Sequence, residues 1–282
     1  MLDTATDTFL DDLAEGVRMV PFLPRVRFEA DLSDVAQRWI RKKHAAGAVH
    51  EPATLAAFIA AQKRAPLKHV FDVGALFGYF SLFAMNFFEG VEVTAFEMHP
   101  GIIPDLHKNV SPYAKIVHGV ITDEVRERVR FWVSGFNIFE EPAGGWDELV
   151  NIPGAMKPRG ANNRGRGFAK VPFTTLDAWC ADNPAPDLLK IDVEGYQAKA
   201  LKGGMGMIAA HKPVIVIELH DPEKLERFGV TNAQTVQPLF DLGYRAYVCT
   251  NFRDADARYE PVTVMGPEHE RLCIMVFMPE GK

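Results

Sequence analysis

Two pairs of side chains capable of acid–base chemistry each follow an apolar run in the second half of the chain. Asp192 and Glu194 come after the first run, and Glu218 and His220 close the second. A histidine is the candidate general base, because its unperturbed pKa of about 6.5 suits proton transfer near neutrality. Asp192 is the candidate for orienting a hydroxyl or stabilising a nearby cation. We therefore predict a catalytic group of Asp192, Glu218 and His220.

The same three side chains offer two carboxylates and an imidazole to a divalent metal. Carboxylates suit magnesium or manganese, and such an ion would lower the pKa of a hydroxyl bound to it. No tight ligand spacing demands a metal, so a site without one stays open. In the purely structural alternative, His220 caps a strand end and Asp192 holds the following turn. Glu194 would then be present only because the helix dipole stabilises an acidic residue at the start of a helix.

A glycine-bearing turn between an apolar strand and an apolar helix is the second feature with chemical meaning. Gly74 and Gly78 lie in it, with Asp72 two residues before the first. Glycine lets a ligand approach the backbone, and the start of the helix offers free N–H groups. A dinucleotide site would need G-x-G-x-x-G, and the Asp72 carboxylate would repel a pyrophosphate. The turn therefore favours a ligand with a cationic or amine group over NAD.

A carboxylate ends the strand that follows this turn. Glu97 lies 25 residues after Asp72. In this position a carboxylate can accept hydrogen bonds from both hydroxyls of a ribose, although a solvated strand end is the simpler alternative. Together, the turn and Glu97 predict a nucleoside site.

Strands and helices alternate along the part of the chain that must position these residues. The apolar runs predict strands at 69–72, 92–97, 115–120, 187–192 and 214–219, with helices at 78–88, 104–110 and 196–210 between them. Such alternation indicates parallel strands with right-handed crossovers. Ligands of these sheets bind beyond the carboxyl ends of the strands, so Asp192 and Glu218 should lie together there.

Two parts of the chain depart from this alternation of parallel strands and helices, one in its middle and one at its end. Strands at 128–134 and 168–173 can pair around a long loop at about 135–167. Two strands at 245–249 and 272–278 follow a helix at 233–242 and should pair antiparallel, because no helix separates them. The predicted fold is α/β, a doubly wound Rossmann-like sheet of seven mostly parallel strands with an antiparallel last strand. Residues 1–66 predict an N-terminal helical cap.

The interrupting loop is rich in glycine, proline and cations. Residues 157–170 contain Arg159, Arg164, Arg166 and Lys170. Loops of this length inside a domain are functional or disordered. This one is expected either to close over an acceptor as a lid or to be a solvated flexible loop.

These motifs resemble those of class I S-adenosylmethionine methyltransferases and, within them, the FkbM-type family. The resemblance spans roughly residues 50 to 220, with 67–282 as the methyltransferase domain. The chain departs from the family at Leu76 and Phe77, where Asn-Ile is usual, and at Met98 and Gln197. The matching segments are His50–Pro52, Phe71–Ala75, Gly78–Ser81, Ala95–Pro100, Thr175–Asp177, Leu189–Gly195, Leu201–Gly204 and Pro213–His220.

The resemblance implies an S-adenosylmethionine-dependent O-methyltransferase that acts on a hydroxyl of a sugar, glycan or natural-product acceptor. Two alternatives stay open, a non-catalytic relative that binds S-adenosylmethionine or a partner, and an NAD-dependent oxidoreductase. The implied cofactor contacts are Asp72, Gly74, Ala75, Gly78, Tyr79, Glu97, Met98 and Asp192.

The composition of the chain argues against several classes of binding partner and cellular location. A formal net charge of −6 argues against general nucleic-acid binding, which normally shows a basic excess. The three cysteines have no CxxC spacing, so neither a zinc site nor a disulfide framework is expected. The amino terminus lacks the pattern of a secretory signal, and the apolar runs are too short to span a bilayer. We expect a cytoplasmic protein with no membrane partner, and its oligomeric state stays open.

Overall fold

The computed structural model describes residues 7–22, 35–134, 137–140 and 167–280. Most of the loop expected at 135–167 therefore lies outside the described residues, and so do Arg159, Arg164 and Arg166. Lys170 is described and is exposed.

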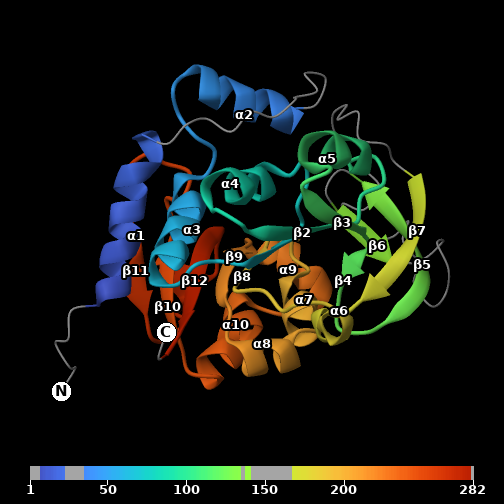
Figure 1. Ribbon diagram of the computed structural model, residues 1–282. Coiled ribbons are helices and arrows are strands. Elements are labelled where there is room, and N and C mark those ends of the chain that lie inside the picture. Colours follow the sequence, from blue (N-terminus) through green and yellow to red (C-terminus); the bar gives the residue numbers. More distant parts are fainter. Residues whose placement is uncertain (1–6, 23–34, 135–136, 141–166, 281–282) are drawn as a thin grey trace.

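A large sheet forms the centre of the molecule, in the order β11-β10-β12-β9-β8-β1-β2-β3 (Figure 1). The strands from β9 to β3 run parallel, and β12 is antiparallel to both β9 and β10. This confirms the doubly wound, mostly parallel sheet with an antiparallel last strand. The strands are β1 (His69–Val73), β2 (Glu92–Glu97), β3 (Ala114–His118), β8 (Leu188–Ile191), β9 (Val214–Leu219), β10 (Tyr244–Cys249), β11 (Glu260–Val262) and β12 (Cys273–Pro279).

The central strands are apolar throughout because helices cover both faces of the sheet. Val70, Leu188 and Val216 pack on one face with α1, α3 and α4. Their strand neighbours Phe71 and Leu189 pack on the other face with α7, α8 and α10. The helices are α1 (Thr8–Met19), α2 (Val35–Ala45), α3 (Pro52–Arg64), α4 (Tyr79–Phe87), α5 (Ile103–Val110), α6 (Leu176–Asp182), α7 (Gln197–Lys202), α8 (Met205–His211), α9 (Pro222–Leu225) and α10 (Asn232–Asp241).

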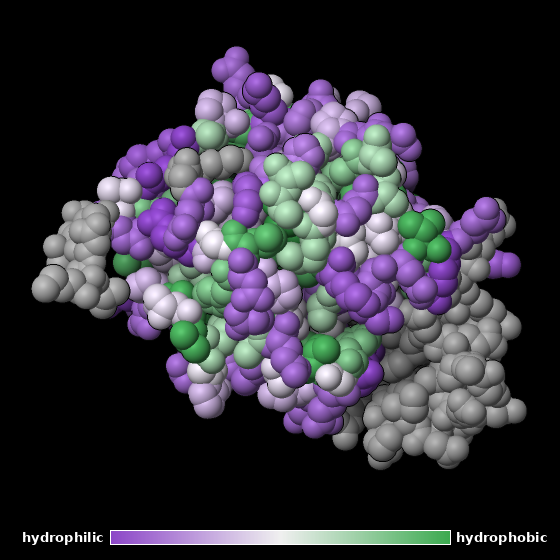
Figure 2. Space-filling model, turned by 90° about the horizontal axis from the view of Figure 1, so that it is seen from below, coloured by the Kyte–Doolittle hydropathy of each residue, from purple (hydrophilic) through white to green (hydrophobic). Residues whose placement is uncertain are grey.

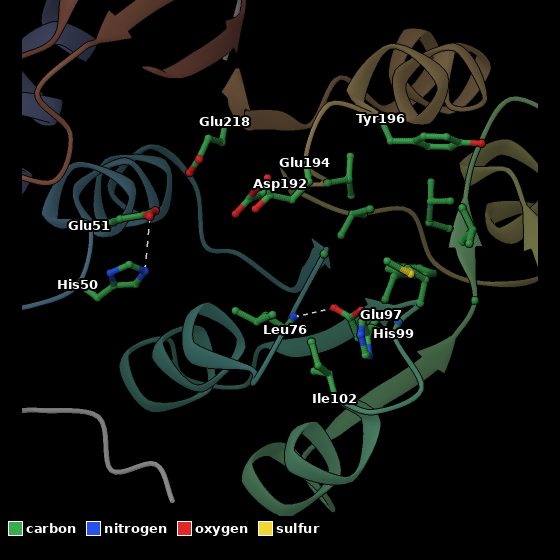
Figure 3. A pocket seen from close by; sticks show the side chains of 18 of the residues that line it. His50, Glu51, Leu76, Glu97, His99, Ile102, Asp192, Glu194, Tyr196 and Glu218 are labelled. Carbon is green, nitrogen blue, oxygen red and sulfur yellow. Dashed lines mark hydrogen bonds and ion pairs between the residues drawn. The ribbon is translucent and has the colours of Figure 1, made fainter. Parts of the chain in front are cut away.

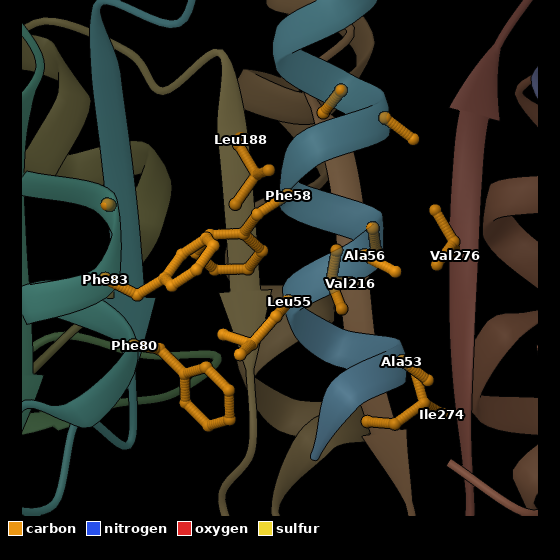
Figure 4. Close-up of a cluster of buried hydrophobic side chains, with 14 of the residues drawn as sticks. Ala53, Leu55, Ala56, Phe58, Phe80, Phe83, Leu188, Val216, Ile274 and Val276 are labelled. Carbon is orange, nitrogen blue, oxygen red and sulfur yellow. The ribbon is translucent and has the colours of Figure 1, made fainter. Parts of the chain in front are cut away.

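Helix α3 lies directly against the sheet. Proline occupies its first turn, where the missing N–H costs no helical hydrogen bond. Figure 4 shows its side chains Leu55 and Phe58 reaching toward Leu188 and the α4 aromatics, while alanines face β9 and β12. The small alanine side chains let this helix approach the sheet closely. As a result, the residue that precedes α3 is held at the carboxyl edge of the sheet.

Two of the elements predicted from the sequence have different bounds in the structure, and in both cases the difference lies at a glycine. The single helix expected at 196–210 is two helices, α7 and α8, separated by Gly203 and Gly204. A Cβ on Gly203 would overlap the carbonyl oxygen of Thr122, so the chain bends where another segment passes close to it. The strand expected at 115–120 ends at His118, and the chain leaves the main sheet at Gly119.

Beyond Gly119 the chain enters a second, smaller sheet in the order β4-β7-β5-β6. Its strands are β4 (Val120–Ile121), β5 (Arg126–Ser134), β6 (Asn137–Glu140) and β7 (Gly167–Thr174). The antiparallel pairing of β5 with β7 confirms the pairing expected around the long loop. This sheet flanks the main one beside β3 and α5 (Figure 1).

Hydrophobic residues on the face shown in Figure 2 form separate patches among hydrophilic ones. Within the described ranges, the helices are all too short or too polar to cross a lipid bilayer.

Candidate active site

A cavity of about 420 Å³ lies at the carboxyl edge of the parallel strands (Figure 3). Of the residues predicted from the sequence, five line it. They are Gly74, Glu97, Met98, Asp192 and Glu218. Leu76 also lines this space without filling it, whereas Phe77 does not line it and is buried. The cavity has one end at the Gly74 turn and Glu97, and another at Glu51 and Glu218.

The Gly74 turn packs tightly against the neighbouring strands. The backbone N–H groups of Gly74 and Ala75 both donate to the carbonyl oxygen of Phe96, at 3.0 Å each. Gly74 has φ +79°, and a Cβ there would overlap the backbone oxygen of Asp192. The turn therefore requires glycine for both its conformation and its close approach to the chain after β8.

Glu97 points from the end of β2 into this end of the cavity. Its Oε2 accepts from the N–H of Leu76 at 2.9 Å, and its Oε1 accepts from the N–H of His99 at 2.7 Å. Burial raises the pKa of Glu97, and the backbone N–H groups that donate to it oppose this shift. Each carboxylate oxygen keeps further acceptor capacity, so Glu97 can still receive hydroxyl groups from a ligand.

The predicted cofactor contacts Asp72, Ala75, Gly78 and Tyr79 are not among the lining residues. Asp72 is fully buried, where it accepts from Ser81 Oγ at 2.8 Å and pairs with Lys190 Nζ at 3.1 Å. The hydroxyl of Tyr79 accepts instead from the backbone N–H of His50 at 3.3 Å. Ala75 and Gly78 shape the turn and the start of α4 without facing the cavity.

Three carboxylates converge at the other end of the cavity (Figure 3). Glu51 precedes α3, Asp192 follows β8, and Glu218 lies in β9. Burial and the charge of Asp192 raise the pKa of Glu51 and of Glu218. Arg253 partly compensates this charge, with Nε 3.4 Å from Glu51 Oε1 and Nη2 3.4 Å from Glu218 Oε1. Oε2 of Glu218 is buried without a hydrogen-bond partner among the described residues.

His220 lies behind this group and does not line the cavity. Its Nε2 is 3.2 Å from Glu194 Oε2, and its Nδ1 is 4.0 Å from Glu218 Oε1. The structure nevertheless gathers the predicted group, because ligand atoms of Asp192, Glu218 and His220 lie within 4.8 Å of one another. His220 is placed to act through its neighbours rather than on a ligand in the cavity.

Glu194 lines the cavity but is already engaged by two other side chains. Lys224 and His220 both contact its Oε2. Although burial would raise it, the pKa of Glu194 is lowered to about 2 by the hydrogen bond from His220 and the charge of Lys224. Glu194 is therefore a paired structural carboxylate.

Several lining residues were not predicted as site residues, among them Trp39, His50, Glu51 and Arg253. His50 is partly buried, with 16% of its side chain exposed. Its desolvation, with the charges of Arg253 and Lys43, lowers its pKa to about 3, so its imidazole is neutral near pH 7. Trp39 is 41% exposed and packs edge-on against His50. The proline after Glu51 signals a helix start, but no pattern shows that Glu51 turns into a cavity.

The sheet order and the cavity at its carboxyl edge define a doubly wound, Rossmann-like protein. A family model described as the methyltransferase FkbM domain matches residues 72–246, more than half of the chain. The chain therefore belongs to the FkbM methyltransferase family.

Similar solved structures include the FkbM methyltransferase of Methylobacillus flagellatus KT, at 13% identity and a TM-score of 0.40. The match covers 96% of this chain and 58% of that one, so the chain spans less than two thirds of that protein. Precorrin-6y C5,15-methyltransferase of Geobacter metallireducens GS-15 matches at 13% identity, with 90% and 95% of the two chains covered and a TM-score of 0.40.

A methyltransferase of Podospora anserina with SAH bound matches at 12% identity, over 98% of this chain and 97% of that one, with a TM-score of 0.39. A search of curated protein sequences found no significant match.

Proposed function

We propose that this chain is an S-adenosylmethionine-dependent O-methyltransferase that acts on a hydroxyl of a sugar, glycan or natural-product acceptor. The observation that carries the proposal is the Glu97 carboxylate, which lines a cavity next to the Gly74 turn and faces three further carboxylates across it. This arrangement suits a donor with a ribose at one end and a cationic sulfonium near the other. The acceptor class comes from the family resemblance.

The donor end holds the nucleoside. Glu97 accepts the ribose hydroxyls, and the Gly74 turn lets the amino-acid part of the donor lie against the backbone. Asp192, which lines the cavity beside Glu51 and Glu218, places a negative charge near the sulfonium. S-adenosylmethionine supplies an activated methyl group, which passes from sulfur to the acceptor oxygen and leaves a neutral thioether.

The acceptor end orients the hydroxyl and takes its proton. Alignment of the two reacting atoms alone can contribute roughly 7–11 kcal/mol at best. We assign proton acceptance to Glu51, because this carboxylate lines the cavity and burial and Asp192 raise its pKa. His220, the candidate from the sequence, has no contact with the cavity. The exposed face of Trp39 offers a surface on which a sugar ring can stack.

Donor binding is tested with S-adenosylhomocysteine in isothermal titration calorimetry. Glu97→Ala is expected to weaken binding about tenfold or more, because hydrogen bonds to a charged group contribute roughly 1.5–3 kcal/mol each. Glu92→Ala is the matched control, since Glu92 is an exposed carboxylate at the opposite end of the same strand. Equal affinity in the two variants would remove the donor assignment, and saturable binding of NADH instead would favour the oxidoreductase alternative.

Proton acceptance is tested by transfer of a labelled methyl group to a panel of monosaccharides, oligosaccharides and hydroxylated natural products. On an acceptor that the wild type methylates, Glu51→Gln is expected to lower kcat by roughly 10²–10⁴-fold, the usual contribution of a general base. Its affinity for S-adenosylhomocysteine should stay within about twofold, because Glu51 lies at the other end of the cavity. An unchanged kcat would contradict the assignment, and Glu223→Gln, an exposed carboxylate on α9, serves as the control.

A further inference from the structure

We propose that Asp192, Glu218 and Nδ1 of His220 form a binding site for a divalent cation of the Mg²⁺ or Mn²⁺ type, and that Arg253 competes with this cation for Glu218. The cation site goes beyond the proposed methyl transfer and does not require it.

The first argument is an uncompensated buried oxygen. Glu218 is 5% exposed, and its Oε2 has no hydrogen-bond partner among the described residues. A buried carboxylate oxygen without a partner is costly, so such atoms are normally satisfied by a proton donor or an ion. Asp192 and Glu51 add negative charge beside it, which makes a cation the favoured partner.

The second argument is the composition and spacing of the ligands. One ligand atom from each of Asp192, Glu218 and His220 lies within 4.8 Å of the others. Oxygen ligands at about 2.0–2.2 Å from a Mg²⁺-sized ion lie about 3–4 Å apart, so small side-chain rotations close this group around a cation. Two carboxylates and one imidazole suit Mg²⁺ or Mn²⁺ better than a thiophilic metal.

The third argument is the hydrogen-bonding state of His220. Its Nε2 lies 3.2 Å from Glu194 Oε2, and that carboxylate also forms an ion pair with Lys224. A carboxylate accepts hydrogen bonds, so Nε2 is the nitrogen that donates a proton to Glu194. Nδ1 then faces the amide Nε2 of Gln197 at 3.5 Å, a long contact that a cation would have to replace. Nδ1 lies on the side of Glu218. A histidine that donates its other N–H to a carboxylate is the usual arrangement at metal sites.

Arg253 takes the position of a competing cation. Its guanidinium contacts Glu218 Oε1 and Glu51 Oε1 at 3.4 Å each, both long for ion pairs of this kind. The side chain is 41% exposed, so it can move into solvent when another cation binds. The two cations therefore exclude each other at Glu218. If the proposed methyl transfer is also correct, a cation there would lower the pKa of an acceptor hydroxyl.

The test is a titration of chelator-treated full-length protein with Mn²⁺, followed by electron paramagnetic resonance without donor or acceptor. We expect saturable binding of one Mn²⁺ per chain. Asp192→Asn and Glu218→Gln should each weaken it about tenfold or more. Arg253→Met should strengthen it several-fold, because a competitor is removed. Glu223→Gln should leave it unchanged, and circular dichroism checks that each variant is folded.

Arg253→Met is expected to strengthen Mn²⁺ binding, whereas the carboxylate variants are expected to weaken it. This opposite effect distinguishes the proposed site from adventitious binding to surface carboxylates. Absence of saturable Mn²⁺ binding by the wild type would overturn the proposal. Equal binding by the wild type, Asp192→Asn and Glu218→Gln would overturn it as well, and weaker binding by Arg253→Met would overturn the competition. Calorimetry with S-adenosylhomocysteine on the same samples tests the donor site separately, so failure of either proposal is recognised independently of the other.

Discussion

Lys190→Met is expected to lower the free energy of unfolding by about 3–5 kcal/mol, the usual result of removing one partner of a buried ion pair. Lys190 Nζ lies 3.1 Å from Asp72 Oδ1, and the two side chains are 4% and 1% exposed. Although burial opposes it, the charges of Asp72 and Asp192 raise the pKa of Lys190, so the ammonium is charged. Within the described part of the chain, the variant leaves the buried Asp72 carboxylate with Ser81 as its one hydrogen-bond donor.

Urea denaturation of the full chain measures this change. Lys202→Met is the matched control, because Lys202 pairs with Asp123 at 2.8 Å while its side chain is 75% exposed. That variant should unfold at the same urea concentration as the wild type, since exposed pairs are screened by water. Adding Asp72→Asn to Lys190→Met should restore part of the lost stability. If Lys190→Met and Lys202→Met were equally stable, Asp72 would not depend on its cation.

Gly74→Ala should impair both folding and donor binding. A Cβ at this position overlaps the backbone oxygen of Asp192, so the turn and the chain after β8 must separate. We expect overpacking to cost about 1–3 kcal/mol beyond the 1–2 kcal/mol of a left-handed conformation. Affinity for S-adenosylhomocysteine should fall about tenfold or more, because the displaced turn is the surface that we propose for the donor.

Gly90→Ala provides the control for conformational strain alone. Gly90 also has positive φ, +72°, but a Cβ there meets nothing within 4 Å. This variant should lose only the cost of the left-handed conformation and should bind S-adenosylhomocysteine like the wild type. Thermal unfolding and calorimetry on both variants separate the two effects. Similar donor affinities for Gly74→Ala and Gly90→Ala would show that contact with Asp192 is unimportant.

The parallel part of the sheet could be predicted because its strands are buried on both faces. Such strands read as continuous apolar runs, and Val214–Leu219 was predicted with its observed bounds. β11 was missed, since its three residues include a proline and carry no apolar pattern. The break between α7 and α8 depends on the close approach of Thr122, which belongs to a distant segment.

The proximity of Gly74 and Glu97 could be predicted for a similar reason. Gly74 follows β1 and Glu97 ends the adjacent strand β2, so local patterns suffice to place them together. Asp72 was placed at the ligand, but the β1–β8 register sets it directly opposite Lys190, which neutralises it. His220 was predicted to follow the same strand as Glu218 and to act as the general base. It does follow β9, but its side chain turns to Glu194 instead of lining the cavity.

The Glu51 helix start and the Arg253 loop have one more consequence. Both lie outside residues 72–246, the range that the family model matches, whereas Gly74, Glu97 and Asp192 lie inside it. The matched segment thus carries the residues of the proposed donor site, while flanking sequence on either side supplies Glu51 and Arg253 to the opposite end of the cavity. Under the proposed function, we expect exchange of those flanks between family members to change the acceptor while the nucleoside pocket stays the same.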